Sequence, residues 1–374
     1  MILYTAIFIP IVVAIILYVF FSHKTVWWEF LIPFAVSILC ILTIKIISEN
    51  GRTDAIEYWN GYIVHADYFE EWNEYIHQTC TTSCGKDCEY TYDCSYVRDH
   101  PPEWEMVDNN GIKFGIYQDV YEWIKRKFDN NEHFVELNRN FYSKDGDEYA
   151  TIWPWKKENF IYVVTKHHYE NRVQASESVF NFQPVTEEDK QKYGLFDYPP
   201  IINNQLPSIL GDSSYYMKEI DNRQYKWINA ILGKEKELRL WVLLFKNPSL
   251  QTFEQQKSYW KNGNKNEFVI CVGINDLYDI NWCQVFSWSE KEDLKIEVRN
   301  KILDQKRLNL DVLADWLLPE LKEKFVRKNF SDFDYLKIEP TGTEILITFI
   351  IVLVVNICLS LYIIFNQFED ETND

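Results

Sequence analysis

The 374-residue chain is short of basic residues, glycine and proline, and each shortage narrows the class of protein. Asp and Glu outnumber Lys and Arg by 56 to 38, which gives a formal charge of −18. A nucleic-acid-binding protein uses cations to neutralise phosphates, so this balance excludes nucleic acid as a partner. Gly and Pro number only 12 each, while aromatic residues make up 17% of the chain. That aromatic content excludes disorder and supplies ample core material.

The usual catalytic signatures are also absent from the sequence. It contains no G-x-S-x-G elbow, no H-E-x-x-H pair, no Walker loop and no G-x-G-x-x-G turn. His167 and His168 end an expected strand, so their side chains point to opposite faces of its sheet and do not bind one metal together. These absences favour a function other than catalysis.

Three long apolar runs are present, and they indicate membrane-spanning helices. They cover residues 2–21, 30–47 and 345–365. About 20 helical residues cross the roughly 30 Å hydrocarbon layer, so each run is long enough. Lys45 can extend from the second run toward the head groups, and Asn356 is the one strongly polar residue of the third. Three spans put the N-terminus and the 49–341 segment on one side of the membrane and the C-terminus on the other.

The sequence therefore predicts an α+β, membrane-anchored protein. Its expected parts are a two-helix transmembrane hairpin at 1–48, a Cys- and aromatic-rich, β-rich part at 49–200, an α/β domain at 201–341, a third transmembrane helix at 342–366 and an acidic tail at 367–374.

Secondary structure is ambiguous at the start of the Cys-rich part and regular in the later domain. Tyr68, Trp72 and Ile76 have helical spacing, yet EYWNGYIV before them reads as a strand, so both alternatives stay open. From about residue 205, strands and helices alternate, which predicts a sheet covered by helices. The expected helices are 215–232, 250–260 and 308–328, and the expected strands are 238–245, 268–274, 282–288 and 294–298.

Two of these strands are expected to pair. Phe268–Ile274 and Trp282–Trp288 should form an antiparallel hairpin with its loop centred on Leu277. That register places Cys271 opposite Cys283 on adjacent strands. In a packed core, both thiols can stay reduced as small apolar groups.

Four closely spaced cysteines form the most specific local motif. Cys80, Cys84, Cys88 and Cys94 lie in a polar, turn-rich stretch, with His77 and His100 flanking it. A structural zinc site usually places its cysteines in CxxC knuckles, which these spacings lack. Disulfides require only Cα atoms roughly 5.5 Å apart, which turns provide. The spacings favour two disulfides over zinc or free thiols, with the connectivity open.

The order of elements over residues 205–340 resembles the TPM domain, a membrane-associated α/β module. The family's layout is a strand, a helix ending in Trp-Gly, a second strand, a hairpin with a basic-Ile-Glu-Val run, and a long final helix. The corresponding segments here are LRLWVLLF, FEQQKSYWKNG, NEFVICVGIND, LKIEV and LNLDVLADWLLPELKEKF. Arg299, Asn300 and Lys301 stand where the family has a Gly-Tyr-Gly-type turn. The resemblance implies either a phosphatase or an assembly factor for membrane complexes, and the missing glycine turn weakens the phosphatase.

Two further inferences concern metal and relatives. Asp276, Asp279 and Asp311 are placed to gather at the strand ends of the TPM-like sheet, where Asp276 and Asp311 would hold a divalent cation such as Ca²⁺. Equally, Asp276 and Asp279 suit a plain turn, and Asp311 a helix N-terminus. The Cys-rich segment also resembles uncharacterised membrane proteins of tailed bacteriophages and their bacterial hosts, a likeness that implies no chemistry.

The sequence thus predicts a scaffold or envelope interaction protein that acts through a large extracytoplasmic loop. Its expected partners are the membrane and other membrane or envelope proteins, with no cofactor. The cysteines favour the extracytoplasmic side, since disulfides persist in oxidising compartments. The alternative is a metal-dependent, phosphatase-like hydrolase that uses the TPM-like domain.

Overall fold

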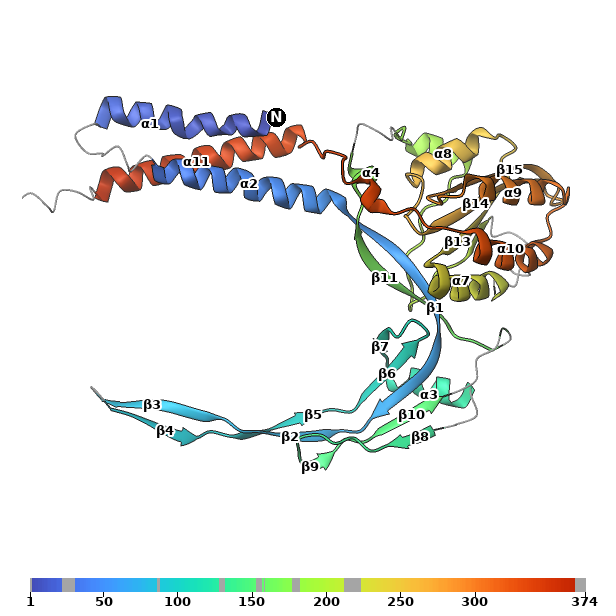
Figure 1. The fold of residues 1–374 in the computed structure, drawn as a ribbon, viewed down its shortest axis with the longest axis horizontal. Helices are drawn as coiled ribbons and strands as arrows, with labels where there is room; N and C mark the ends of the chain where they lie inside the picture. The colour runs from blue at the N-terminus through green and yellow to red at the C-terminus, as the bar shows by residue number, and fades with distance from the viewer. Residues whose placement is uncertain are drawn as a thin grey trace, which may run out of the picture. The chain divides into compact units, whose positions relative to one another are not determined.

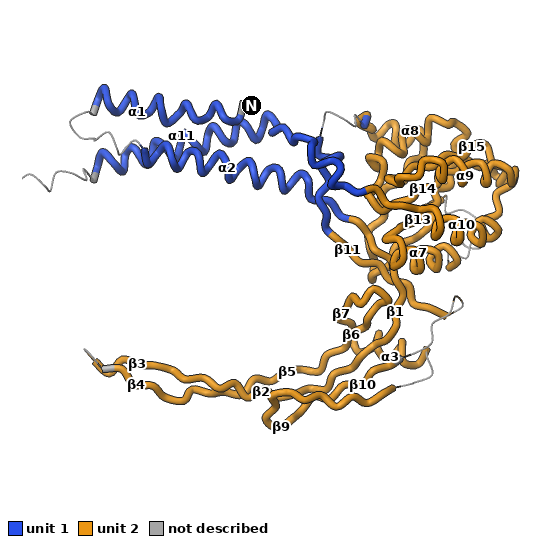
Figure 2. The backbone as a smooth tube through the Cα atoms, in the orientation of Figure 1, with its two compact units in different colours: residues 1–56, 168–182, 329–374 blue, residues 57–167, 183–328 orange. Residues whose placement is uncertain are grey.

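The computed structural model describes residues 2–21, 31–85, 88–127, 132–152, 157, 159–176, 182–211 and 223–366. The chain forms two compact units (Figure 2). Unit 1 contains residues 1–56, 168–182 and 329–374, and unit 2 contains residues 57–167 and 183–328. The connection at 22–30, the acidic tail and the first part of the helix expected at 215–232 lie outside the described residues.

Unit 1 is built on three apolar helices. The first is η1 (Ile2–Ile7) continued by α1 (Phe8–Phe21), the second is α2 (Leu31–Thr53) and the third is α11 (Gly342–Asn366). All three are long and apolar enough to cross a membrane. Leu3, Ala6, Ile41 and Val352 form the buried contact among them. Most of their other apolar side chains face outward, as expected of helices that lie in lipid.

A buried polar contact joins two of these helices. The Asn356 side-chain amide donates to Ser37 Oγ and to the Val352 carbonyl, both at 2.7 Å. The amide nitrogen is thus satisfied by its own helix and by a neighbouring helix, and the bond to Ser37 is a polar contact between two apolar helices. Unit 1 is completed by α4 (Arg172–Ala175) and η3 (Phe330–Phe333).

Unit 2 begins with a six-stranded sheet in the order β7-β6-β1-β10-β8, with β11 also paired to β1. The strands are β1 (Asp54–Phe69), β6 (Glu103–Asp108), β7 (Lys113–Gly115), β8 (Glu132–Val135), β10 (Glu148–Ile152) and β11 (Tyr162–Glu170). Helix α3 (Gln118–Lys127) packs Tyr121 and Ile124 against Ile63, Ala66 and Met106 of this sheet.

A long hairpin extends from this sheet (Figure 1). It consists of β2 (Trp72–Ile76), β3 (Thr79–Gly85), β4 (Cys88–Asp93) and β5 (Tyr96–His100), and β9 (Phe141–Asp145) pairs with β2. The helical alternative for this region is wrong, because Tyr68 lies in β1 and Trp72–Ile76 form β2. Pairing with β5 and β9 supplies hydrogen bonds on both sides of β2, whereas a short isolated helix is only marginally stable in water.

The rest of unit 2 is a four-stranded sheet in the order β12-β13-β14-β15. β12 (Ile209–Gly211), β13 (Arg239–Phe245) and β14 (Glu267–Ile274) are parallel, and β15 (Ile280–Ser287) is antiparallel to β14. Residues of α7 (Arg223–Lys236), α9 (Glu292–Leu303) and α10 (Leu310–Lys324) cover one face, and α8 (Gln251–Tyr259) covers the other. The short helix α5 (Glu187–Tyr193) precedes β12.

The strand expected at Leu294–Val298 is wrong, since these residues lie in α9. Leu294, Val298 and Ile302 are buried at spacings of four residues, so one helical face packs on the core. Glu292 and Asp293 lie in the first turn, where carboxylates favour a helix N-terminus. This pattern outweighs the local β preference of Ile296 and Val298.

The expected β14–β15 hairpin is present, but its expected register is off by one residue. Cys271 lies opposite Gln284, and Cys283 lies opposite Val272, because the register shifts between Gly273 and Ile274. Trp282 packs at the point of the shift: a Cβ built on Gly273 would lie 2.1 Å from Trp282 Nε1, so the indole occupies the space above the glycine. Cys271 and Cys283 consequently pack in the cores on opposite faces of the sheet.

Candidate functional site

The hairpin from Trp72 to His100, called the arm below, has no hydrophobic core of its own. No described residue between positions 70 and 100 is buried. Isolated two-stranded ribbons are marginally stable in water, so the arm requires other support. Part of this support comes from β9, which pairs with the base of the arm at Trp72 and Glu74.

A disulfide supplies the remaining support. Cys80 and Cys94 are bonded, with their Cα atoms 5.8 Å apart, where β3 begins and β4 ends. Next to this bond, the Cys94 N–H donates to the Gln78 carbonyl at 2.9 Å. Cys84 is also disulfide-bonded. The side chain of Cys88 lies outside the described residues. The pairing of Cys80 with Cys94 corresponds to one of the three connectivities that the sequence left open.

Aromatic side chains project from both faces of the arm and from β9. Tyr90 and Tyr92 lie two residues apart on the same face of β4. Their exposed fractions are 55% and 46%, and their ring centroids are 5.9 Å apart. At the base, the Tyr75 ring stacks on Tyr142 of β9, which is 63% exposed. Large exposed aromatics grouped in this way are typical of a surface that a partner covers.

The arm is also acidic. Residues 70–100 carry Glu70, Glu71, Glu74, Asp87, Glu89, Asp93 and Asp99 against only Lys86 and Arg98. Some of these charges are paired locally, as in the 2.9 Å contact between His100 Nε2 and Glu74. The excess of carboxylates gives the surface a negative potential that attracts cationic groups.

A cavity of about 810 Å³ lies between β6, β7 and the start of α3. Below it is called the acidic cavity. Its lining residues are Pro102, Glu103, Trp104, Glu105, Gly115, Ile116, Tyr117, Gln118, Asp119 and Glu122. Tyr117 is 81% exposed, and the Trp104 ring stacks on Tyr68 of β1. Aromatic rings combined with carboxylates are the groups that bind Lys and Arg side chains.

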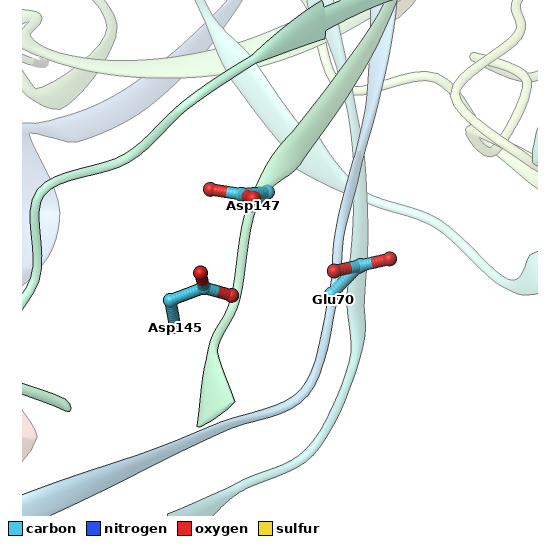
Figure 3. A group of neighbouring side chains, drawn as sticks. All are labelled: Glu70, Asp145 and Asp147. Atoms are coloured by element: carbon cyan, nitrogen blue, oxygen red, sulfur yellow. The ribbon is translucent and has the colours of Figure 1, made fainter. Parts of the chain in front are cut away.

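Three carboxylates meet at the base of the arm (Figure 3). Ligand atoms of Glu70, Asp145 and Asp147 all lie within 4.8 Å of one another. They come from the ends of β1, β9 and β10, and Asp147 Oδ1 also accepts from the Leu137 N–H at 3.1 Å. Gly146 between the two aspartates has φ of 69° and sits against Trp72, so the turn requires glycine here. The group adds negative charge beside the aromatic surface.

A buried acid lies within the six-stranded sheet. Asp67 of β1 is only 2% exposed, its Oδ1 has no hydrogen-bond partner, and Oδ2 lies 3.3 Å from His65 Nε2. Burial, reinforced by Glu148 and Glu105, raises the pKa of Asp67 to about 7. Burial also lowers the pKa of His65. Sequence reasoning missed this buried acid, because Glu105 and Glu148 reach Asp67 only through strand pairing.

The aspartates predicted as metal ligands occupy separate, exposed positions. The Asp276 side chain is 88% exposed and lies 3.4 Å from Lys246 Nζ. Asp279 accepts from the Asn275 side-chain amide at 3.0 Å, as in a turn. Asp311 is exposed in the first turn of α10. Within the described residues, neither Asp276 nor Asp311 belongs to a group of three ligand atoms within 4.8 Å of one another.

Comparisons with protein-family models, with curated proteins and with solved structures find no match to this chain. The arm and the acidic cavity therefore indicate function by their chemistry alone. Both combine exposed aromatic rings with carboxylates, and this combination attracts basic protein segments.

Proposed function

We propose that this protein is a membrane-anchored interaction protein whose acidic, aromatic arm binds a basic surface of a partner protein of the cell envelope. The observation that carries the proposal is the arm itself. It has no buried described residue, it is closed by the Cys80–Cys94 disulfide, and it exposes aromatic rings. A chain ordered in this way without a core gains apolar burial when a partner covers it.

Charge complementarity identifies the chemistry of the partner. The arm and the acidic cavity both present carboxylates beside aromatic rings. A Lys or Arg side chain satisfies both groups at once, through ion pairing and through contact with a ring face. The partner is therefore a protein that offers a basic segment. The arm contacts the basic segment of the partner, and the acidic cavity binds one Lys or Arg side chain of that segment.

The experiment uses the full-length protein with a photo-crosslinking residue in place of Tyr92. Cross-linked partners should carry basic segments, and capture should fall as salt increases, because exposed charges are screened beyond about 8 Å at physiological ionic strength. The effect of Tyr90→Ser is measured with the cross-linking residue in place of Tyr96. Tyr90→Ser should capture about tenfold less partner than the protein that keeps Tyr90, in the range expected for an interface aromatic. Leu277→Ser is the matched control, since Leu277 is 66% exposed on a loop of the other sheet. Equal capture by the Tyr90 variant and wild type would refute the proposal.

We further propose that the three apolar helices span the membrane and that unit 2 is extracytoplasmic. The disulfide supports this side, because such bonds persist in oxidising compartments. Protease added to intact cells or spheroplasts should cut within residues 49–341 and spare the C-terminal tail. Cleavage of the tail alone would reverse the orientation.

We propose, finally, that the domain at 201–341 is TPM-like. The order of β13, α8, β14, β15 and α10 supports this relationship. The basic-Ile-Glu-Val segment departs from the family layout, since it lies in α9. Of the two activities that the resemblance implies, the assembly role agrees with an interaction arm on the same chain.

A further inference from the structure

A second cavity, of about 540 Å³, lies entirely within unit 1. Its lining residues come from η1, from the last part of α2, from α4 and from the segment before α11. The start of η1, the end of α2 and the start of α11 lie at the same end of the helical bundle (Figure 1). The residues that line it are Leu3, Tyr4, Lys45, Glu49, Arg172, Asp334, Tyr335, Leu336, Lys337, Ile338, Glu339 and Pro340. Neither the arm nor the acidic cavity shares a residue with it.

The position of Lys45 in α2 indicates the level at which this cavity would lie in a membrane. Lys45 lies eight residues before the end of α2 at Thr53, or about 12 Å along the helix axis. The apolar part of α2 ends beyond it, and the first and third spans both start at the same end, at Leu3 and Gly342. With these helices in a bilayer, the cavity lies where the hydrocarbon meets the lipid head groups, the level to which a lysine extends.

Cationic groups line one part of the cavity. Lys45 Nζ lies 5.9 Å from the centroid of the Tyr4 ring. Arg172 is held in place by Glu49, whose Oε1 lies 2.9 Å from Nη1, and by the Leu336 carbonyl at 3.2 Å. Lys337 is exposed at the rim. An ammonium and a guanidinium that line the same cavity are groups that bind phosphate oxygens.

Acidic and apolar residues complete the lining. Glu49, Asp334 and Glu339 match Lys45, Arg172 and Lys337 in number, so the lining has no net formal charge. A purely anionic ligand would meet repulsion from the acids, whereas a ligand with charges of both signs meets complementary groups. Leu3, Leu336 and Ile338 also line the cavity, and they are packed against the protein, so they form its apolar wall.

We propose that this cavity binds the headgroup of a zwitterionic phospholipid with a primary ammonium group. The phosphate contacts Lys45 and Arg172, and the ammonium contacts the carboxylates of Asp334 and Glu339. The site goes beyond the proposed partner-binding function, and it depends only on insertion of the three helices in a membrane. Lipid bound there ties α2 and the segment before α11 to the membrane surface.

Native mass spectrometry of the full-length protein tests this proposal. Protein purified in mild detergent is mixed with phosphatidylethanolamine, phosphatidylcholine or phosphatidylglycerol, and retained lipid is measured. Phosphatidylethanolamine should be retained most. Lys45→Gln should reduce its retention by about tenfold, since a charge-assisted hydrogen bond is lost. Lys45→Arg should restore it, and Lys322→Gln on the surface of α10 is the matched control.

Several outcomes would overturn the proposal. Equal retention of the three lipids removes the zwitterionic specificity, and unchanged retention in Lys45→Gln removes the site. Displacement of the lipid by millimolar inorganic phosphate would identify a free-phosphate site instead. Two variants distinguish this site from the arm. Tyr90→Ser should lose partner capture and retain the lipid, whereas Lys45→Gln should lose the lipid and retain partner capture.

Discussion

Gly233 of α7 lies directly against the backbone of Asn60 in β1. A Cβ built on Gly233 would lie 2.1 Å from the Asn60 carbonyl oxygen. The same asparagine accepts from Tyr162 OH at 2.6 Å and donates from Nδ2 to the Leu238 carbonyl at 3.3 Å. Arg239, fully buried, donates to Tyr162 OH at 3.0 Å. The contacts of Asn60, Tyr162 and Arg239 join the two sheets of unit 2. These polar groups are buried, so the loss of one partner leaves another group unsatisfied.

Gly233→Ala is therefore expected to destabilise unit 2. The added methyl group forces α7 away from β1, and overpacking of this kind costs about 1–3 kcal/mol. Thermal unfolding of purified protein measures the effect. Gly115→Ala is the control, because a Cβ at Gly115 meets nothing within 4 Å. Equal melting temperatures for the two variants would show that the helix moves without cost.

Asp67→Asn should stabilise the protein as pH increases. The folded pKa of Asp67, about 7, exceeds its ordinary value of 3.8, so ionisation opposes folding. The penalty is absent below pH 4, grows between pH 4 and 7, and is complete above that, at no more than about 4 kcal/mol. Melting temperatures of wild type and variant should coincide near pH 4 and diverge by pH 8. Asp276→Asn, with its exposed side chain, should show no such divergence.

Cys80→Ser should loosen the arm without unfolding the sheets. The Cys80–Cys94 bond closes a loop of 15 residues, counting both cysteines, which corresponds to about 3 kcal/mol on the entropy model. Limited proteolysis should therefore cut the variant within residues 72–100 and leave the rest of unit 2 intact. Cys358→Ser, in the third apolar helix, is the control because Cys358 is a free cysteine. Wild-type resistance in the Cys80 variant would mean that strand pairing alone holds the arm.

Asp276→Ala together with Asp311→Ala decides between the two functions that the sequence predicts. A divalent-cation hydrolase would lose its hydrolysis of a generic phosphate ester, and Ca²⁺ would no longer raise its melting temperature. An interaction protein would keep its partner capture unchanged. We expect the second result, because both aspartates are exposed and belong to no convergent group among the described residues. Loss of an initial phosphatase activity in the double variant would contradict this expectation.

Long-period signals in the sequence predicted the fold better than short segments did. The three apolar helices and the adjacent β14 and β15 follow from runs long enough to fix the type of structure. The strand predicted at Leu294–Val298 (LKIEV) was wrong. The propensity of these five residues favours a strand, whereas the burial of Leu294, Val298 and Ile302 shows a helical period. The predicted pairing of Cys271 with Cys283 was also wrong. The register shifts where Trp282 packs on Gly273, and a tertiary contact of this kind is not visible in the sequence.

The candidate site was predicted only in its covalent part. The even number of closely spaced cysteines indicated disulfides, and Cys80–Cys94 is one. Tyr90 and Tyr92 are exposed because no described segment forms a second layer over the arm, which composition does not reveal. The surroundings of Asp67 depend on residues brought together by strand pairing from β1, β6 and β10, far apart in the chain. The acidic cavity depends on the pairing of β6 with β7 and on the position of α3 beside them.

The shift at Gly273 also determines how the molecule responds to oxidation. Cys271 and Cys283 face opposite cores, so they have no route to each other while the sheet is folded. Burial raises the pKa of the Cys283 thiol to about 12 and raises that of Cys271 well above its ordinary value, so neither forms the thiolate that reacts. Reduction of the Cys80–Cys94 bond therefore acts on the arm and leaves the thiols of the four-stranded sheet unchanged. In a reducing medium we expect the three apolar helices and the four-stranded sheet to stay folded while the arm loses its covalent closure.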